Sequence, residues 1–436
     1  MQSNKKRVLL AGASIVSIAA ILAATFFFKT AATQAAAPNP YQVTIGALKN
    51  AHPQFASLGA KGPEAKKAHP QNSTCVAGLD TITNFCGQYT VAGVDSHGAA
   101  NSTWFYNMVG NAPQQTGPGT TTFDAPIIPV AIQLLNADGT VALTYDPLQF
   151  VRPVLNSPVF STTKYSSGPK PTQFTDALQR AEFFNQAKNS WHTMLDPRVK
   201  TERTMKIPAG SYQFALNADG SCCLFVLVDS GVFQNLLFPP NFPVDNTTVI
   251  GAAELAGDIT TKDISTFLFP NTFLYIGDPS NCCIIGFHSF DFEPGVPSNG
   301  GLPRAYVVQY ASWISPGIFG GGFEDITALS HEMSETFNDP FVTQFNNLDV
   351  TPWWLSGGNC QNDLETGDVV EGLANPTVAI TTHGYTYHPQ TEAMLQWFES
   401  SGTSNAIDGA YSYPNESVLT TSNISQNLNC TPPITG

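Results

Sequence analysis

The chain has 436 residues, of which 42% are apolar and only 12% charged, with 19 basic side chains against 33 acidic ones. This apolar content is sufficient for the hydrophobic cores of two or three domains, which argues against a disordered chain. The formal net charge of −14 would repel phosphate backbones, so nucleic acid is excluded as an expected partner.

Residues 1–37 have the features of an export signal. The basic run Lys5-Lys6-Arg7 precedes an apolar stretch over 8–28, and Ala35-Ala36-Ala37 offers small residues for cleavage. The stretch is also long enough to span a bilayer, so a retained membrane anchor is the alternative. In either case we expect the body of the protein outside the cytoplasm, secreted, periplasmic or at the cell surface. Cleavage would remove four basic residues and change the net charge from −14 to −18.

Residues 38–120 are rich in Pro, Gly, Ala, Ser and Thr, which is typical of a loosely structured arm. The main domain is expected over 121–400, where apolar patterning is clear, and a Thr- and Asn-rich tail over 401–436. Within the main domain, residues 175–195 have apolar side chains at helical spacing and predict one long amphipathic helix. Alternating apolar patterns and Gly-containing turns predict hairpins and a further strand, over 127–145, 211–228, 273–290 and 304–312. The predicted fold class is therefore α+β, or mixed α/β.

The eight cysteines are an even number in a chain expected to be exported, which predicts disulfides. Adjacent cysteines bridge each other only with strain, so the pairs Cys222-Cys223 and Cys282-Cys283 are predicted to staple two neighbouring strands together. The remaining predicted bridges are Cys75 to Cys86 and Cys360 to Cys430. A thiolate metal site is disfavoured because no C-x-x-C spacing occurs.

A second helix is predicted from about residue 323 to 338, ended by Pro340. His331 and Glu335 are four residues apart and project together, so one helical turn offers two metal ligands. Glu332, one step away, could hold an attacking water. A glutamate can replace the second histidine of H-E-x-x-H because carboxylate oxygen also binds zinc. The pattern H-E-x-x-E alone, however, is more typical of a solvated helix face.

A third ligand would come from Glu365, Asp368 or Glu371, which recur every three residues and could face one way. Asp339, about 80° round the helix from His331, is a weaker candidate. Zn²⁺ is the expected cation because an imidazole belongs to the set, and Ca²⁺ is the alternative for a carboxylate-rich cage.

These motifs together resemble the zincin-like H-E-x-x-E metallopeptidase family of bacteria and phages, and the related plant EXORDIUM or phosphate-induced protein family. The likeness covers about residues 283–398 at motif level and extends through coarser elements back to about 127. The matching segments are 286–290, 305–312, His331-Glu332-x-x-Glu335, Asp339-Pro340, Glu365-x-x-Asp368-x-x-Glu371-Gly372 and 395–398.

The resemblance implies a zincin-like domain with a twisted mixed sheet and an active-site helix, and the cysteine count adds the expectation that this domain is disulfide-stapled. It implies a divalent metal held by His331, Glu335 and one of the three later acids, with Glu332 as general base. His288 falls in a matched segment and is either a site residue or a hydrogen-bonded strand histidine. The strand over 305–312 would be the sheet edge on which an extended peptide lies.

The expected function is an exported zinc-dependent hydrolase, in particular a peptidase acting on peptide or protein substrates. A membrane would be involved only through an uncleaved N-terminal segment. The alternative is a non-catalytic extracellular or cell-wall-associated binding protein with a structural metal. A closed shell of four protein ligands would favour the binding protein, and an open position on the metal would favour the enzyme.

Overall fold

The structure is a computed structural model that describes the following residues: 39–48, 51, 53–55, 76, 78–92, 101–113, 119–188, 190–320, 322–342, 350–355, 360–423 and 430. The predicted signal or anchor segment and Cys75 lie outside these residues. Pro40–Gly436 forms one unit, so the boundaries predicted at residues 120 and 400 do not coincide with a division of the structure. The fold class is mixed α+β, as predicted.

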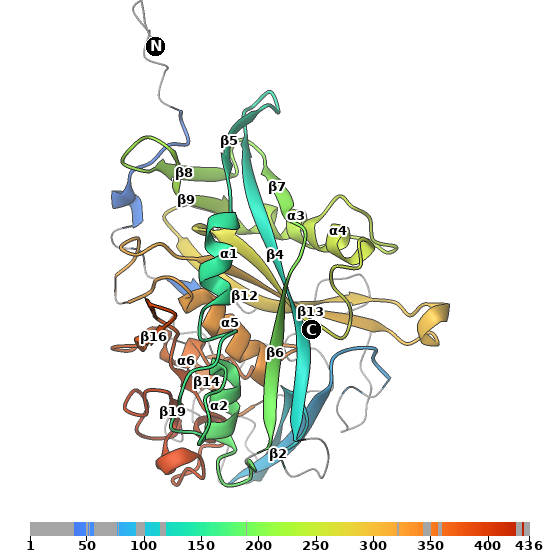
Figure 1. Ribbon diagram of the computed structural model, residues 1–436, viewed down its shortest axis with the longest axis vertical. Helices are drawn as coiled ribbons and strands as arrows, with labels where there is room; N and C mark the ends of the chain where they lie inside the picture. The colour runs from blue at the N-terminus through green and yellow to red at the C-terminus, as the bar shows by residue number, and fades with distance from the viewer. Residues whose placement is uncertain are drawn as a thin grey trace, which may run out of the picture. The chain divides into compact units, whose positions relative to one another are not determined.

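A large mixed sheet is the centre of the fold (Figure 1). Within the described residues it has eleven strands, and its main path runs β5-β4-β10-β13-β12-β11-β9-β8. Strands β4, β10 and β13 are parallel to one another, and β12 is antiparallel to β13. The strands are β1 (Gln54–Phe55), β4 (Thr120–Leu135), β5 (Val141–Tyr145), β6 (His192–Val199), β7 (Arg203–Ile207), β8 (Tyr212–Leu216), β9 (Cys222–Asp229), β10 (Ile264–Pro270), β11 (Thr272–Tyr275), β12 (Cys282–Glu293) and β13 (Arg304–Trp313).

The helices are short, and smaller strand pairs accompany the main sheet. The α-helices are α1 (Leu148–Leu155), α2 (Phe174–Glu182), α3 (Ser230–Leu237), α4 (Val249–Leu255), α5 (Thr327–Asn338), α6 (Asp368–Glu371) and α7 (Leu395–Phe398). Single 3-10 turns cover Ile45–Leu48, Pro297–Asn299 and Ile407–Gly409. The paired small strands are β2 (Asn84–Ala92) with β3 (Asn101–Val109), β14 (Trp353–Trp354) with β15 (Cys360–Gln361), β16 (Ile380–Thr382) with β17 (Tyr385–Tyr387), and β18 (Glu392–Ala393) with β19 (Ser412–Tyr413).

Side chains along the central strands alternate between the two faces of the sheet and so contribute to two separate apolar cores. On β12, Phe287 packs in a core that includes side chains of α3 and α4, whereas Phe290 and Phe292 pack in a core that includes side chains of α5. The same division holds on β13, where Val308 belongs to the first core and Val307 to the second. Because successive side chains point to opposite faces of a sheet, α5 covers one face and α3 and α4 cover the other.

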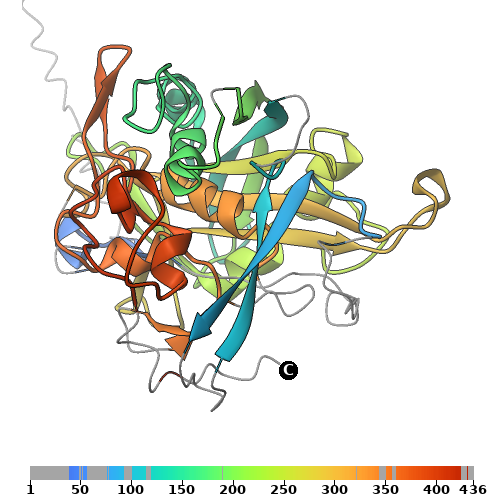
Figure 2. The ribbon, with the colours of Figure 1, turned by 90° about the horizontal axis from the view of Figure 1, so that it is seen from below.

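The segment predicted to be a loose arm contains ordered structure. Strands β2 and β3 pair over nine positions, from Asn84 with Val109 to Ala92 with Asn101. Figure 2 shows this hairpin, in blue, beside α5, which is in contact with β3. Phe85 and Met108 are buried in a cluster with Trp353 and Trp397. These aromatic contacts hold the hairpin on the main domain, and the composition of the segment did not indicate them.

The C-terminal segment is likewise part of the packed structure. Ala406, Ile407 and Tyr413 are buried in a cluster with Phe174 and Leu178 of α2. Strand β19 pairs with β18, which precedes residue 400. A Thr- and Asn-rich composition therefore does not make the described part of 401–436 a separate tail, because its apolar side chains find a partner surface on α2.

The prediction of one long helix over 175–195 is wrong for the second half of that range. Helix α2 ends at Glu182, and β6 begins at His192 and pairs in parallel with β4 over eight positions. The buried Trp191 packs against Phe183 and donates its indole N–H to the carbonyl of Asn111. Helical spacing was present in the sequence, but pairing with the long strand β4 decides the backbone conformation of residues after 190.

The three predicted hairpins are confirmed. Strands β4 and β5, β8 and β9, and β11 and β12 pair antiparallel. At the first two tips, Asp138 accepts hydrogen bonds from the backbone and hydroxyl of Thr140, and Asp219 accepts the same pair from Ser221. Both tips are therefore turns closed by an aspartate side chain.

The prediction that the adjacent cysteines staple neighbouring strands is wrong. Cys222 is bonded to Cys223, and Cys282 is bonded to Cys283. The physical reason is the sheet order, because β11 lies between β9 and β12 and separates the two pairs. The predicted bridge between Cys360 and Cys430 is confirmed. Cys86 is disulfide-bonded, and its predicted partner, Cys75, lies outside the described residues.

The strand expected to receive a peptide is not a sheet edge. Strand β13 is paired on one side with β10 and on the other with β12. Its backbone groups are therefore already used by neighbouring strands and cannot accept an extended substrate. The expectation of a peptide-binding edge at 305–312 is corrected accordingly.

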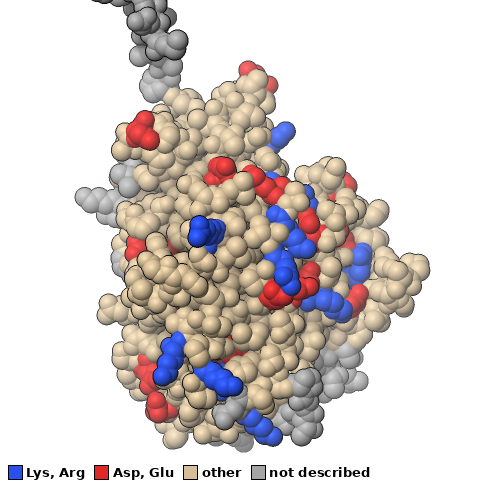
Figure 3. All heavy atoms as spheres, in the orientation of Figure 1, with Lys and Arg blue, Asp and Glu red and all other residues tan. Residues whose placement is uncertain are grey.

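Few charged groups lie on the face of the molecule seen in Figure 3, and those of both signs gather on the side where Figure 1 shows α4 and β7. This agrees with a charged content of only 12%. No helix in the described part of the chain has both the length and the apolar character needed to span a bilayer.

Replacing both Cys360 and Cys430 by serine is expected to lower the free energy of unfolding by up to about 4 kcal/mol. The bridge joins residues 70 positions apart and so removes much conformational freedom from the unfolded chain. Urea denaturation of the wild type and the double variant measures the difference. The matched control replaces Cys222 and Cys223, which are one position apart and should matter less by this mechanism. Equal losses in the two variants would contradict the chain-entropy account.

Candidate metal centre

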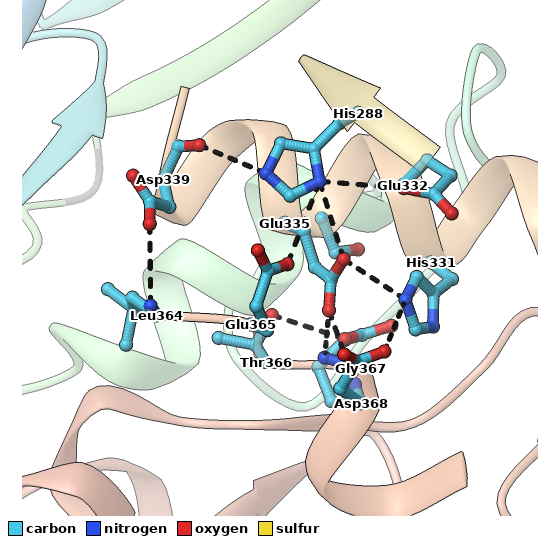
Figure 4. A network of polar contacts seen from close by, with 12 residues as sticks. His288, His331, Glu332, Glu335, Asp339, Leu364, Glu365, Thr366, Gly367 and Asp368 are labelled. Carbon is cyan, nitrogen blue, oxygen red and sulfur yellow. Dashed lines mark hydrogen bonds and ion pairs between the residues drawn. The ribbon is translucent and has the colours of Figure 1, made fainter. Parts of the chain in front are cut away.

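Helix α5 places His331 and Glu335 one turn apart and on the same side (Figure 4). Nε2 of His331 lies 3.0 Å from Oε2 of Glu335, and every residue of the helix is buried. The helix begins at Thr327, and not near residue 323, because Asp325 has a φ of 48°, which a helix cannot continue. It ends before Pro340, as predicted. Helical spacing alone thus brings two of the predicted ligands together.

The distant acidic segment reaches this pair. Oδ1 of Asp368 lies 3.5 Å from Nε2 of His331. The backbone N–H groups of Gly367 and Asp368 donate hydrogen bonds of 2.9 and 3.2 Å to Oε1 of Glu335. Glu371 ends α6 and is half-buried. Among the acids predicted on this segment, Asp368 is therefore the one placed against His331.

His288 on β12 is part of the same site. Its side chain is buried, and Nδ1 lies 3.4 Å from Oε2 of Glu335, 3.5 Å from Oε2 of Glu332 and 3.7 Å from Oε2 of Glu365. Figure 4 shows Glu335 and Glu365 below the imidazole and Glu332 beside it. The sequence left open whether His288 was a site residue or a hydrogen-bonded strand histidine. The geometry makes it a site residue, and it also makes Glu365 one.

Both imidazoles are held so that one nitrogen faces the carboxylates. Nε2 of His288 lies 3.1 Å from the carbonyl oxygen of Asp339, which can only accept, so this nitrogen donates. Nδ1 of His331 lies 3.1 Å from Oε1 of Gln390. The amide of Gln390 is oriented by donation from Nε2 to the carbonyl of Gly367 at 2.7 Å. Nδ1 of His288 and Nε2 of His331 therefore face inward, as in histidines that bind metals.

Asp339 was considered as a metal ligand, but in the structure it orients His288 and the backbone before Glu365. Its carbonyl orients His288, and its Oδ2 accepts a hydrogen bond of 3.3 Å from the backbone N–H of Leu364. The side chain thus holds the chain just before Glu365. Asp339 positions two parts of the site and is placed behind the imidazole of His288 in Figure 4.

The inward-facing atoms form two groups of candidate ligands that share Glu335, one with His288 and Glu365 and one with His331 and Glu332, and the ligand atoms of each group lie within 4.8 Å of one another. Among the described residues, no hydrogen-bond partner is found for the buried atoms Nδ1 of His288, Oε1 of Glu332 and Oδ1 of Asp368. Ligands bound tetrahedrally at zinc distances are separated by roughly 3.3–3.6 Å. The separations of 3.4 Å between His288 and Glu335 and 3.5 Å between His331 and Asp368 fall in that range, whereas the 3.0 Å between His331 and Glu335 is a hydrogen-bond distance. Each group offers one imidazole with carboxylates, a donor set that zinc accepts.

The pKa shifts of the buried acids also fit a site that binds a cation. Burial raises the pKa of Glu332 to about 7, and burial together with the charge of Glu335 raises the pKa values of Glu365 and Asp368. Burial would raise the pKa of Glu335 too, but His331 and His288 lower it well below its usual range.

The pKa values of the two imidazoles are raised well above the usual range because the carboxylates outweigh the opposite effect of burial. Without a cation, these side chains take up protons to offset the buried negative charge. A bound divalent cation would replace those protons, so cation binding must release them.

Two glycines allow the site to form. A Cβ atom at Gly286 of β12 would lie 2.4 Å from Oε1 of Glu332, and one at Gly367 would lie 2.3 Å from Nδ1 of His331. Contacts this short are sterically forbidden, so any larger residue would displace a functional side chain. The backbone of β12 and that of the 365–368 segment therefore approach α5 only because these positions carry no side chain.

Sequence reasoning missed Gln390 and the two glycines as parts of the site. Gly286 stands in a segment quoted for the family resemblance, which was the one available signal. Gln390 lies shortly before the matched segment at 395–398, but its type and spacing give no sign of a contact with His331. Its role depends on a fold that brings residues 59 positions apart together.

Comparisons of the chain with protein-family models, with curated proteins and with solved structures find no match.

The purified protein is expected to retain about one zinc ion per chain at neutral pH. His331→Ala should reduce zinc affinity by at least about 100-fold, and His288→Ala and Gln390→Ala by about 10- to 100-fold, because these two side chains orient ligands. Lowering the pH should release the metal, since protons compete for the same atoms. Metal analysis and titration with a zinc-buffered indicator measure these effects. His192→Ala is the control, and equal zinc retention in all four variants would contradict the assignment.

Gly286→Ala and Gly367→Ala are each expected to impair metal binding, because the added methyl group would overlap Glu332 or His331. Gly320→Ala is the matched control, since nothing lies within 4 Å of a Cβ atom built there. Zinc titration and circular dichroism of the three variants separate loss of the site from loss of the fold. A folded Gly367→Ala variant with wild-type zinc affinity would show that His331 is not a ligand.

Proposed function

We propose that this protein is an exported metal-dependent hydrolase with a zincin-like site, and in particular a peptidase. The observation that supports the proposal most strongly is the buried convergence of two imidazoles and several carboxylates. Each imidazole is oriented from behind by a hydrogen bond to an oxygen atom, at 3.1 Å in both cases. Such an arrangement is costly to maintain unless the inward atoms bind something.

The residues that would hold the metal are His331 through Nε2 and Glu335 through Oε2, and Asp368 lies next to them. His288 belongs with Glu335 and Glu365 to a second group of candidate ligands, so it would position Glu335. An imidazole in the set favours Zn²⁺ over Ca²⁺, which prefers oxygen ligands throughout. A bound Zn²⁺ would activate a water molecule and stabilise negative charge on an attacked carbonyl group.

Glu332 is the residue proposed as general base. It lies on α5 beside both ligands of that helix, and its Oε2 is 3.5 Å from Nδ1 of His288. Its other oxygen, Oε1, is buried and makes no hydrogen bond, so it is free to take a proton from water. Gly286 leaves the space in which this oxygen lies.

The substrate class is taken from the resemblance to H-E-x-x-E metallopeptidases. Because β13 is an interior strand, a peptide would have to be held by another part of the chain. The N-terminal signal on which export depends lies outside the described residues, so export and a membrane contact through that segment belong to the proposal. An acidic net charge continues to disfavour nucleic acid as a partner.

A second candidate is a non-catalytic extracellular or cell-wall-associated binding protein in which the metal is structural. One observation favours it. The side chains of His288, His331, Glu332, Glu335, Glu365 and Asp368 are at most 4% exposed. A site with this many buried ligand atoms can fill every coordination position of the metal with protein atoms, as structural zinc sites do. A hydrolase would need an opening movement to admit a peptide.

Glu332→Gln distinguishes the two functions. For the hydrolase, this substitution should lower the rate of hydrolysis of an unfolded protein by about 10²- to 10⁴-fold, because it removes the general base. It should leave zinc content unchanged, since the proposal gives Glu332 the role of base and His331 and Glu335 the role of ligands. Proteolysis of casein and a peptide library, followed by mass spectrometry, measures the activity.

Glu324→Gln, a change of the same type just before α5, is the control and should retain activity. A zinc-loaded wild type that cleaves no peptide in the library would reject the hydrolase in favour of the binding protein.

A further inference from the structure

A second group of acidic side chains lies on the opposite face of β12 from His288. Asp291 and Glu293 are odd-numbered positions of the strand, like Phe287, which packs with α3 and α4. Successive side chains alternate between the two faces of a strand. His288 therefore faces α5, whereas Asp291 and Glu293 face α4. The third member of the group, Glu254, lies in the last turn of α4.

These three carboxylates converge closely. One oxygen atom from each lies within 4.8 Å of the other two. Calcium binds carboxylate oxygens at about 2.3–2.6 Å, so two ligands across one ion are separated by at most about 5 Å. The group is therefore compact enough for its three members to contact one cation.

Asp291 is the observation that points to a ligand. It is 1% exposed, and among the described residues no N–H or alcohol O–H group donates a hydrogen bond to either of its carboxylate oxygens. Both oxygens of Glu254 and Oε1 of Glu293 are buried in the same way, so within the described part of the chain only the other carboxylates of the group are within hydrogen-bond reach. A buried carboxylate that lacks donors is strongly unfavourable unless it is protonated or bound to a metal. The cluster therefore has the unused oxygen ligands of an ion site.

The positive charge supplied by the protein is not sufficient. Arg304 forms an ion pair with Glu293 and donates a hydrogen bond of 2.9 Å to the hydroxyl of Tyr306. One arginine against three carboxylates leaves two negative charges if all are ionised. Burial first, and the neighbouring acids second, raise the pKa values of Glu254, to about 10, and of Asp291. A divalent cation would neutralise the remaining charge without the need for protons.

We infer that Glu254, Asp291 and Glu293 bind a hard divalent cation, with Ca²⁺ as the preferred ion, and that this ion ties α4 to the central sheet. The donors are all oxygen, which selects calcium or a similar hard cation and disfavours zinc. This site is independent of the candidate zinc centre and of the hydrolase proposal, because it lies on the other face of the sheet and shares no residue with it.

Calcium titration of the full chain followed by thermal unfolding tests the inference. After treatment with a chelator, added CaCl₂ should raise the unfolding midpoint of the wild type by about 3 °C at a concentration about 100 times Kd. Asp291→Asn and Glu254→Gln should each abolish this response. Both remove a poorly paired carboxylate, so neither variant should unfold below the calcium-free wild type. MgCl₂ at equal concentration should have a smaller effect.

Two controls locate the response. Asp138→Asn changes an exposed turn aspartate and His288→Ala changes the candidate zinc centre, and both should keep the calcium response. Terbium luminescence gives a direct readout, because Tyr306 is the cross-strand partner of Asp291 and can transfer excitation to a bound ion. Tyr306→Phe should lose most of that signal. A wild type with no calcium response up to about 10 mM, or an Asp291→Asn variant that responds like the wild type, overturns the inference.

Discussion

The carboxylate of Glu335 is the group on which the rest of the site depends. Its Oε2 lies within 3.4 Å of both imidazoles, and its Oε1 accepts two backbone hydrogen bonds from Gly367 and Asp368. One side chain of α5 thus joins β12 and the 365–368 segment. Because it is buried, this charge must be compensated by groups in the protein or by a cation. Groups from three separate chain segments contact this carboxylate.

The position of β12 inside the central sheet determines which ionisable side chains lie on each of its two faces. Alternation sends His288 toward α5 and Asp291 toward α4, so a single strand contributes to two clusters of ionisable groups. The cluster on the α5 side contains two imidazoles, whereas the cluster on the α4 side contains carboxylates and one arginine. Imidazole nitrogen and carboxylate oxygen differ in the metals they favour. The two faces are therefore suited to different cations, although they belong to the same β-strand.

Several parts of the fold could be predicted because they depend on local periodicity or on turn chemistry. The spacing of His331 and Glu335 places them on one side of α5, and Pro340 ends that helix. The turns at Asp138 and Asp219 close hairpins through their own side chains. In contrast, the apolar spacing over 175–195 was misleading. It is compatible with a helix, but from His192 onward these residues are extended and pair with β4.

By itself, the sequence determined the one-turn geometry of His331, Glu332 and Glu335, because helical spacing is a short-range property. The sequence also identified the acidic segment that meets them, because its acids recur every three residues. Only the tertiary structure decided that His288 belongs to the site, that Gln390 orients His331, and that β13 is interior. It also decided that adjacent cysteines bond to each other, since β11 separates the pairs. These outcomes depend on which strands become neighbours. Strand order is a long-range property that the side-chain pattern of each strand does not encode.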